Sequence, residues 1–371
     1  MKNRMCEMFG IDLPIFAFSH CRDVVVEVSK AGGMGVLGMA RMSPDQVEAD
    51  LKWIDDHIEG KPYGIDVLMP QKIDDVSEMK YDPDELLPKE HVQFVRDMLD
   101  KAGIPQLPEA EDTELKREIV KGMNFTPRES LEMIKVCMKH PIKLIVNALG
   151  SPPKSLVEEA HAKGIKVGAL AGKPRHAIKH RDVGCDFVVA VGTEAGGHTG
   201  ELSSMVLWPS IVDAVAPMPV LGAGGVGRGR QMAAALVLGC EGIWAGSLWL
   251  KTAQSEVIPE IKAKMFEAEH SDSIMTTTVT GKPCRTLNNA FSRAYDAPGA
   301  PKTLPAPAQN YLWWQEGRTR VERVRAKDFL TYPVGQVVGD MKEEISVKET
   351  VYDLLNEMLD AKDRLDGMIG K

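Results

Sequence analysis

Eight short runs of apolar residues recur along the chain, and polar or glycine-containing segments separate them. Continuous apolar runs of four to eight residues are typical of strands that are buried on both faces. These runs predict strands at 14–17, 35–38, 63–69, 144–148, 166–171, 187–191, 219–223 and 242–245.

Apolar positions at helical spacing occupy the stretches between these runs. They predict helices at 24–31, 44–57, 127–139, 156–163, 175–183, 209–216 and 228–238. Strands that alternate with helices form βαβ units on a parallel sheet. Eight such units predict an α/β fold, a closed (β/α)8 TIM barrel, and a doubly wound open sheet is the alternative.

One segment, 71–121, interrupts this alternation between the third strand and its helix. It contains weak helical patterns near 89–102 and 109–122. An insertion at this point lies on the catalytic face of a barrel, because the strand-to-helix loops build that face. The segment is interpreted as a mostly helical cap or lid, with a solvated surface excursion as an equal alternative.

The chain is therefore divided into three parts. Residues 1–70 and 122–295 form the barrel, 71–121 form the inserted cap, and 296–371 form a C-terminal helical extension that packs on the barrel. The last predicted helix, 347–369, carries an apolar stripe at helical spacing. Packing on the barrel is the first interpretation of that stripe, and a dimer seam is the alternative, so a homodimer stays open.

Composition and charge exclude several classes of protein. The net charge of −8 over 371 residues, without a Lys/Arg-rich run, argues against a nucleic-acid partner. No apolar stretch approaches the ~20 residues that span a membrane, and the N-terminus lacks the apolar core of a signal peptide. The six cysteines form no CxxC motif, which argues against a metal site and for reduced thiols in the cytoplasm.

A histidine lies in a glycine-rich loop directly after the sixth predicted strand. The loop reads Gly-Thr-Glu-Ala-Gly-Gly-His-Thr-Gly over 192–200, which places His198 beside Gly196 and Gly197. Glycines let a backbone approach a ligand closely, and histidine exchanges protons near neutral pH. His198 is therefore a candidate active-site base next to a bound ligand, and a purely structural loop histidine is the alternative.

The segment 219–229 combines a strand, a glycine-rich loop and the start of a helix. Its glycines at 222, 224 and 227 satisfy the GxGxxG pattern of dinucleotide-binding folds. About six strands precede it, however, and no acidic residue ends the next strand. A barrel explains the loop better, because the loops after strands seven and eight, here 222–227 and 244–247, commonly hold a phosphate.

Several motifs in order resemble the nitronate monooxygenase (2-nitropropane dioxygenase) family of FMN-dependent barrels, a group that includes flavin-dependent enoyl reductases and NAD(P)H:quinone reductases. The resemblance covers most of the chain outside 71–121. It depends on Gly192–Gly200 and on weaker motifs at 31–35, 222–225, 233–239, 244–247, 280–285 and 288–291.

The resemblance implies FMN as cofactor and His198 as the base that acts on a neutral nitroalkane. It also implies which residues line the cofactor: Gly196, Gly197, Gly224 and Gly225 at the phosphate and ribityl chain, Trp244, Ala245, Gly246 and Ser247 around the phosphate, and Ala17, Phe18, Ser19 and Asp66 along the isoalloxazine.

The chain departs from the family pattern at three places near the cofactor. Asp66 stands where the family has Asn, and an ionised Asp accepts hydrogen bonds but cannot donate them. Val191 stands where the family has Gln. The family's Pro-Met after the first strand is replaced by residues 17–21, so His20 and Cys21 are either a second acid/base pair or ordinary loop residues.

By resemblance, the expected activity is oxidative denitrification of alkyl nitronates or nitroalkanes, small molecules that react with O2. The alternative is an NAD(P)H-dependent flavin reductase that acts on a quinone or an enoyl thioester, with Trp208, Trp313 and Trp314 as candidate pocket residues. A third hypothesis is a colourless barrel that binds a sugar phosphate and performs lyase or isomerase chemistry. A flavin carrier without catalysis would leave His198 unused.

Overall fold

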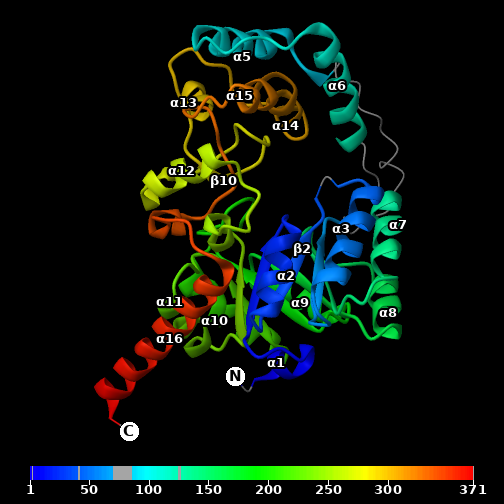
Figure 1. The fold of residues 1–371 in the computed structure, drawn as a ribbon, viewed down its shortest axis with the longest axis vertical. Coiled ribbons are helices and arrows are strands. Elements are labelled where there is room, and N and C mark those ends of the chain that lie inside the picture. The colour runs from blue at the N-terminus through cyan, green and yellow to red at the C-terminus, as the bar shows by residue number, and fades with distance from the viewer. Residues whose placement is uncertain (2, 41, 70–85, 124–126, 371) are drawn as a thin grey trace.

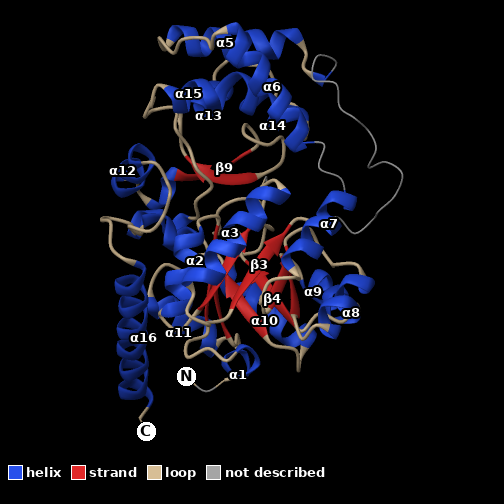
Figure 2. Cartoon of the chain, turned by 45° about the vertical axis from the view of Figure 1, so that its right-hand side comes forward, coloured by secondary structure: helices blue, strands red, loops and turns tan. Residues whose placement is uncertain are grey.

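Eight parallel strands close in sequence order into a barrel in the computed structural model (Figure 1, Figure 2). The structure describes residues 1, 3–40, 42–69, 86–123 and 127–370. The strands are β1 (Ile15–Ser19), β2 (Met34–Gly38), β3 (Tyr63–Val67), β4 (Leu144–Asn147), β5 (Lys166–Ala171), β6 (Phe187–Val191), β7 (Val220–Ala223) and β8 (Gly242–Ala245). The predicted TIM barrel is confirmed and the open sheet is wrong, because β1 pairs with β8 as well as with β2.

Helices cover the outside of this barrel, and their bounds follow the predicted ones closely. They are α2 (Arg22–Lys30), α3 (Pro44–His57), α7 (Pro127–Cys137), α8 (Lys154–Ala162), α9 (Pro174–Asp182), α10 (Ser204–Val215) and α11 (Gly229–Val237). None of the described helices combines the length and apolarity needed to cross a bilayer.

Helix α10 begins at Ser204, five residues before the predicted start at Pro209. Proline is favoured in the first turn of a helix because its missing N–H has no partner there, which suggested a start at Pro209. The helix begins earlier because the Glu194 carboxylate accepts a hydrogen bond from the Ser204 N–H. Pro209 then lies inside the helix.

Strand alternation sorts the barrel side chains into two layers. One set fills the interior, and it comprises Phe16, Met34, Val36, Leu144, Val146, Phe187, Val189, Leu221 and Trp244. The other set packs against the helices. Helix α1 (Arg4–Phe9) closes the N-terminal end of the barrel, because the Phe9 ring meets those of Phe16 and Phe187 edge-on at 5.5 and 6.0 Å.

A second hydrophobic core lies beyond the opposite, C-terminal end of the barrel. It joins part of the insertion to the region after β8, and we call this region the cap, residues 86–123 and 252–345. The cap contains α5 (Lys89–Lys101), α6 (Glu109–Met123), α12 (Pro259–Glu267), α13 (Ala290–Tyr295), α14 (Ala308–Leu312), α15 (Thr319–Arg323) and the antiparallel hairpin β9 (Ser273–Thr276) and β10 (Cys284–Leu287) (Figure 1).

Apolar contacts and two charged anchors hold α5 to the rest of the cap. Val95 and Leu99 of α5 belong to the same buried cluster as Phe291 and Trp313. The Arg96 guanidinium donates two hydrogen bonds, of 2.8 and 2.9 Å, to the buried Glu316 carboxylate.

The second anchor uses the buried Arg320, which donates to Asp100 Oδ1 and to the Ile104 carbonyl, each at 2.7 Å. The described part of the insertion is thus attached to residues far along the sequence. The division of the chain at residues 70, 121 and 295 stays a proposal.

The last helix, α16 (Val347–Ile369), has the predicted bounds and returns to the barrel side of the molecule (Figure 2). Its Val347, Val351 and Leu354 are buried in the cluster that surrounds the barrel strands. Gly229, at the start of α11, lies so close to it that an added Cβ would stand 2.1 Å from the Leu354 carbonyl oxygen. The apolar stripe therefore packs on the barrel helices over its first half.

Candidate active site

The candidate site lies at the C-terminal mouth of the barrel, where loops follow β1, β6, β7 and β8. Loops at this end carry the active site in TIM barrels, because they converge around the axis. The predicted residues Phe18, His198, Gly224 and Ser247 come from four such loops or strand ends, and the closed barrel brings these ends together.

The loop after β6 is anchored by the carboxylate of Glu194. Both of its oxygens accept from the Ser204 N–H at 3.1 Å, at the start of α10. The Ser204 hydroxyl lies 2.9 Å from Glu194 Oε2 and 2.8 Å from the Gly224 carbonyl oxygen, so it links the loops after β6 and β7. A carboxylate at a helix start is also favoured by the helix dipole.

The cap holds the same loop from the other side. Gly197 and Arg285 exchange two backbone hydrogen bonds of 2.9 and 2.7 Å, which adds the loop to strand β10. The Arg285 side chain donates to the Thr193 carbonyl at 2.9 Å. The N–H of Gln336 donates to the Glu194 carbonyl at 2.9 Å. The histidine loop is therefore fixed jointly by barrel and cap.

His198 is exposed, and a cap carbonyl determines which ring nitrogen carries the hydrogen. Its Nδ1 lies 2.8 Å from the carbonyl oxygen of Pro283. A carbonyl only accepts, so Nδ1 is the donor, and the neutral ring has its basic lone pair on Nε2. No described residue forms a hydrogen bond with Nε2, so this nitrogen can accept a proton from a substrate.

The loops after β7 and β8 offer free backbone donors of the kind that bind a phosphate. Gly224 and Gly225 have φ of 91° and 69°. Within the described ranges, the N–H groups of Gly225, Val226 and Gly246 donate to no protein acceptor. Successive free N–H groups in such a turn form a concave site for anions. The Ser247 hydroxyl accepts from the Gly335 N–H at 2.8 Å and keeps its own hydrogen for another acceptor.

Steric tests show why glycine is needed in this cradle. An added Cβ at Gly224 would stand 2.8 Å from the Gly192 carbonyl oxygen, and one at Gly196 would stand 2.8 Å from the backbone of Val334. In contrast, nothing lies within 4 Å of such an atom at Gly197, which faces open space. The donors and the close approach of the loops fit the phosphate end of FMN.

Two aromatic rings lie beside this cradle, where the isoalloxazine is expected. Phe18 and Trp244 point into the barrel mouth and stack with their ring centroids 6.3 Å apart. The side chains of Ala17 and Ala245 pack instead toward the outer helices, so only their backbone can reach a ligand. The Ser19 hydroxyl accepts from the Cys21 N–H at 3.1 Å.

Asp66 is a buried carboxylic acid among the inward-facing residues of the strands. It lies at the C-terminal end of β3 and is 6% exposed. Burial raises the pKa of its carboxyl well above the usual value, and no charged group contributes. Val191, also at the mouth, supplies only an apolar side chain.

His20 and Cys21 follow one another in sequence but contact different groups. His20 Nδ1 donates to the Gly38 carbonyl at 2.7 Å. The buried Cys21 thiol donates to the Gln254 carbonyl at 3.0 Å, and burial raises the pKa of this thiol. The geometry gives no direct contact between the two side chains, so an acid/base pair gains no support from it.

The three tryptophans considered as pocket residues have different environments. Trp208 is buried and its indole N–H donates to the carbonyls of Ala190 and Ala223, at 3.1 and 3.2 Å. Trp313 is buried in the cap core. Trp314 is partly exposed, with the Arg318 guanidinium 3.9 Å above its ring.

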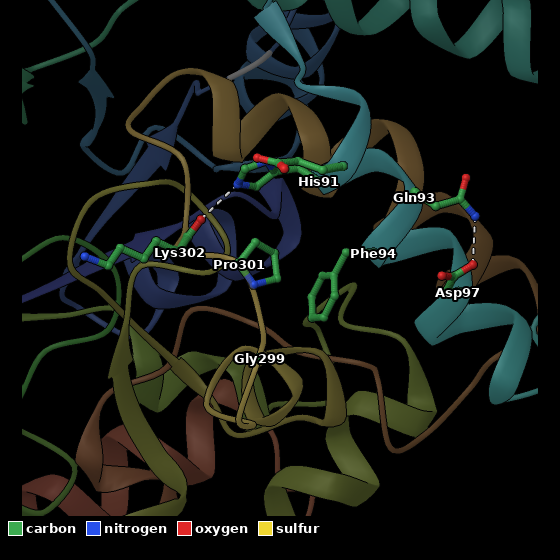
Figure 3. Close-up of a pocket in the computed structure, with 8 residues that line it drawn as sticks. His91, Gln93, Phe94, Asp97, Gly299, Pro301 and Lys302 are labelled. Carbon is green, nitrogen blue, oxygen red and sulfur yellow. Dashed lines mark hydrogen bonds and ion pairs between the residues drawn. The ribbon is translucent and has the colours of Figure 1, made fainter.

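An open groove of about 690 Å³ lies elsewhere, between α5 and the 299–302 loop of the cap (Figure 3). His91 reaches across to this loop, with Nε2 3.0 Å from the Lys302 carbonyl oxygen, while Phe94 lines the floor. None of the residues expected to bind FMN lines this groove. It is therefore separate from the candidate site.

Several residues that build the site were not among the predicted ones. Glu194 stands within the histidine motif, so its position could have indicated a role. Pro283, Arg285 and Gly335 contact site residues that are 85 or more positions away in the sequence. No local sequence pattern predicts such contacts, because they depend on where the cap lies on the barrel.

Comparison with known proteins places this architecture in a family. The family model of nitronate monooxygenases matches residues 2–357. A Mycobacterium tuberculosis protein, provisionally named monooxygenase Rv1533, is 43% identical over 378 residues, which cover 100% of both chains. A protein of Staphylococcus saprophyticus named as a probable nitronate monooxygenase is 26% identical, over 78% of this chain and 80% of its own.

Solved structures share the fold of this chain. A nitroalkane oxidase from Streptomyces ansochromogenes superposes with a TM-score of 0.75 at 22% identity, over 97% of this chain and 99% of its own. FabK from Thermotoga maritima superposes with a TM-score of 0.71 at 22% identity, over 100% of both chains. Because the family model spans nearly the whole chain, the protein belongs to the nitronate monooxygenase family and is an oxidoreductase.

Proposed function

We propose that this oxidoreductase depends on FMN and oxidises alkyl nitronates or nitroalkanes with O2, releasing a carbonyl compound and nitrite. One observation carries the proposal: the exposed imidazole of His198 presents a basic Nε2 at the same barrel mouth as a glycine cradle with free N–H donors. A base and an anion site at one barrel mouth are what a phosphate-bearing cofactor and a proton-losing substrate require.

The chain's own residues would hold the cofactor at its two ends. The N–H groups of Gly225, Val226 and Gly246, with the Ser247 hydroxyl, would bind the phosphate, and Phe18 and Trp244 would lie beside the ring system. Charge-assisted hydrogen bonds contribute about 1.5–3 kcal/mol each, so a few of them hold a phosphate without Lys or Arg. FMN, when bound, supplies the electron transfer between substrate and O2.

The role of His198 depends on the form in which the substrate arrives. A nitroalkane must lose its α-proton, and Nε2 of His198 would accept it while Nδ1–H stays on the Pro283 carbonyl. A nitronate has already lost this proton. Turnover of the nitroalkane should therefore need His198 far more than turnover of the corresponding nitronate.

Two apolar side chains favour an alkyl substrate. Leu68 and Leu149 follow β3 and β4 at the same end of the barrel, and they are 42% and 52% exposed. Large exposed apolar side chains at the rim of a mouth can contact the hydrocarbon part of a small ligand.

The test is anaerobic mixing of the purified protein, loaded with FMN, while the flavin absorbance is followed. One aliquot receives an alkyl nitronate and the other receives NADH or NADPH. We expect rapid bleaching with the nitronate and none with the nicotinamide nucleotides. Bleaching by NAD(P)H alone would replace the proposal with the reductase activity on quinones or enoyl thioesters. A protein that binds no flavin would contradict both and favour the sugar-phosphate barrel.

A further inference from the structure

The carboxyl group of Asp66 lies inside the barrel mouth, and no described residue is its partner. Ile65 and Val67 of β3 pack toward the outer helices, so Asp66 between them points to the interior. It is paired in register with Gly38 on β2 and Val146 on β4. Its side chain makes no hydrogen bond or ion pair to any residue within the described ranges, although it is only 6% exposed.

The described residues around Asp66 do not stabilise a negative charge on its carboxyl. Neither β2 nor β4 contributes a titratable side chain, and the interior layer beneath is apolar. His20, the titratable side chain that follows β1, turns its Nδ1 to the Gly38 carbonyl. Transfer of an unpaired carboxylate into such an environment is so unfavourable that the group takes up a proton instead.

A protonated carboxyl still needs an acceptor for its hydrogen. The carboxyl oxygens of Asp66 are not among the described polar atoms that are fully enclosed and lack a partner, so they reach the open space of the mouth, where a ligand can supply this acceptor. Asp66 stands at the ligand-facing end of a strand, in the same mouth as Phe18, Trp244 and the glycine cradle. The missing acceptor is therefore to be sought on a ligand of this mouth.

We propose that Asp66 carries a proton at neutral pH and donates it in a hydrogen bond to an acceptor atom of the flavin bound in the barrel mouth. The inference depends on the flavin of the proposed function. It gives Asp66 a donor role that an ionised carboxylate cannot fill, and it makes cofactor affinity depend on one proton.

Proton linkage determines whether the affinity for FMN rises or falls with pH. Where the bound complex requires the neutral acid and the free protein can ionise, raising the pH above the pKa of Asp66 in the free protein weakens FMN binding. For one proton the limiting slope is about tenfold in Kd per pH unit. An amide in place of the acid donates at every pH and removes the slope.

The experiment measures the Kd of FMN from the quenching of its fluorescence, between pH 5 and pH 9. It compares the wild type with Asp66→Asn and with the control Asp213→Asn, which removes an exposed carboxylate on α10. Ratios to the wild type at each pH cancel the titration of free FMN. We expect Asp66→Asn and wild type to agree at low pH and then to diverge about tenfold per pH unit, while Asp213→Asn follows the wild type.

A second measurement reports on Asp66 without any flavin. The pKa of a neutral buried acid is higher in the folded than in the unfolded chain, so the folded protein binds more protons between the two values and its stability falls as the pH rises. In thermal unfolding of the apoprotein, the Tm of Asp66→Asn should therefore rise relative to the Tm of the wild type as the pH increases.

Each outcome decides a different point. Parallel pH profiles of Kd for wild type and Asp66→Asn, with FMN bound tightly, would overturn this inference and leave the proposed function in place. A pH effect on unfolding alone would likewise show a buried acid that does not contact the cofactor. Failure of all three proteins to bind FMN at any pH would overturn the proposed function together with the inference.

Discussion

The barrel and the cap are built from different kinds of contact. In the barrel, eight strands bury apolar side chains on both faces, and Asp66 interrupts the apolar interior near the mouth. In the cap, short elements surround one apolar cluster and depend on partly buried ion pairs, such as Arg96 with Glu316. The same packing of apolar strands against helices recurs around the barrel, whereas the cap also depends on individual polar contacts.

This difference assigns separate tasks in the site. The barrel supplies the groups that we propose face the ligand: the cradle glycines, the aromatic pair and His198. The cap supplies carbonyls and N–H groups that orient them, from Pro283 to His198 and from Gly335 to Ser247. Substitutions in the barrel mouth should therefore change chemistry or cofactor binding, while substitutions in the cap core should change stability.

The largest effect is expected from His198→Ala. Loss of a positioned base lowers a rate by about 10²–10⁴-fold, so turnover of a nitroalkane should fall by that factor while FMN stays bound. Turnover of the nitronate, which needs no base, should change by less than tenfold. The control His57→Ala removes an exposed histidine of α3. Full activity of His198→Ala on the nitroalkane would remove the assignment of the base.

A smaller effect is expected from Gly224→Ala in the cradle. The new Cβ meets the Gly192 backbone at 2.8 Å, and a φ of 91° strains any L side chain. Strain of about 2–3 kcal/mol corresponds to an FMN Kd raised about 30- to 150-fold. The control Gly60→Ala has a φ of 73° with nothing within 4 Å, and should leave the Kd unchanged. Equal Kd values for both variants would place the phosphate elsewhere.

The Arg96→Met variant tests the polar contacts of the cap, again against a matched control. The variant leaves the Glu316 carboxylate, whose side chain is 5% exposed, without its partner. Because Arg96 itself is 37% exposed, we expect a loss of about 2 kcal/mol in the free energy of unfolding, less than for a fully buried pair. Urea unfolding measures this loss. Lys52→Met, at an exposed ion pair on α3, should cost at most about 0.5 kcal/mol.

The Kd of FMN is the second measurement on the Arg96→Met variant, and it separates stability from cofactor binding. If the cap core contributes stability alone, the Kd of FMN for Arg96→Met should stay within about threefold of the wild type at temperatures where the variant is folded. A large rise in Kd would show that α5 also controls the mouth.

The smallest effect is a pH dependence in the cap that opposes that of Asp66. Burial lowers the pKa of Lys264 to about 8, while its Nζ donates to the Leu330 carbonyl at 2.8 Å. Between pH 8 and its usual pKa of about 10.4, the unfolded chain binds more protons, so stability rises with pH. We expect about 1–2 kcal/mol after solvent screening.

Urea unfolding at pH 7.5 and pH 10 measures this rise as a difference between variants. Lys264→Met should lack the increase, and Lys327→Met, which removes an exposed lysine, should keep it. Identical increases in all three proteins would mean that Lys264 titrates normally.

The barrel could be predicted from sequence because the pattern that indicates each of its strands is local. A strand buried on both faces reads as a continuous apolar run, and all eight runs became strands with bounds shifted by no more than two residues. The helix Val347–Ile369 was predicted with its full bounds from its apolar stripe, and its observed start carries a capping box of Ser346 and Glu349.

The cap helices α5 and α6 match the weak helical patterns near 89–102 and 109–122, but the rest of the cap was not predicted because its elements are short and mixed in composition. Strands β9 and β10 have four residues each, and they include Thr276 and Arg285 among apolar neighbours. A four-residue strand has too few positions to show a period, so only its pairing defines it. The π-helical turn at Trp313–Arg318 likewise follows no sequence pattern, although it places Glu316 opposite Arg96.

The sequence by itself determined the barrel, the order of its loops and the residue types at its mouth, because strand period and glycine content are local properties. Only the tertiary structure decided that Pro283 orients His198, that Glu194 and Ser204 together join two loops, and that Asp66 has no partner among the residues that the structure describes. Those facts depend on distances between residues far apart in sequence, and burial changes the chemistry of a group only after the chain has closed around it.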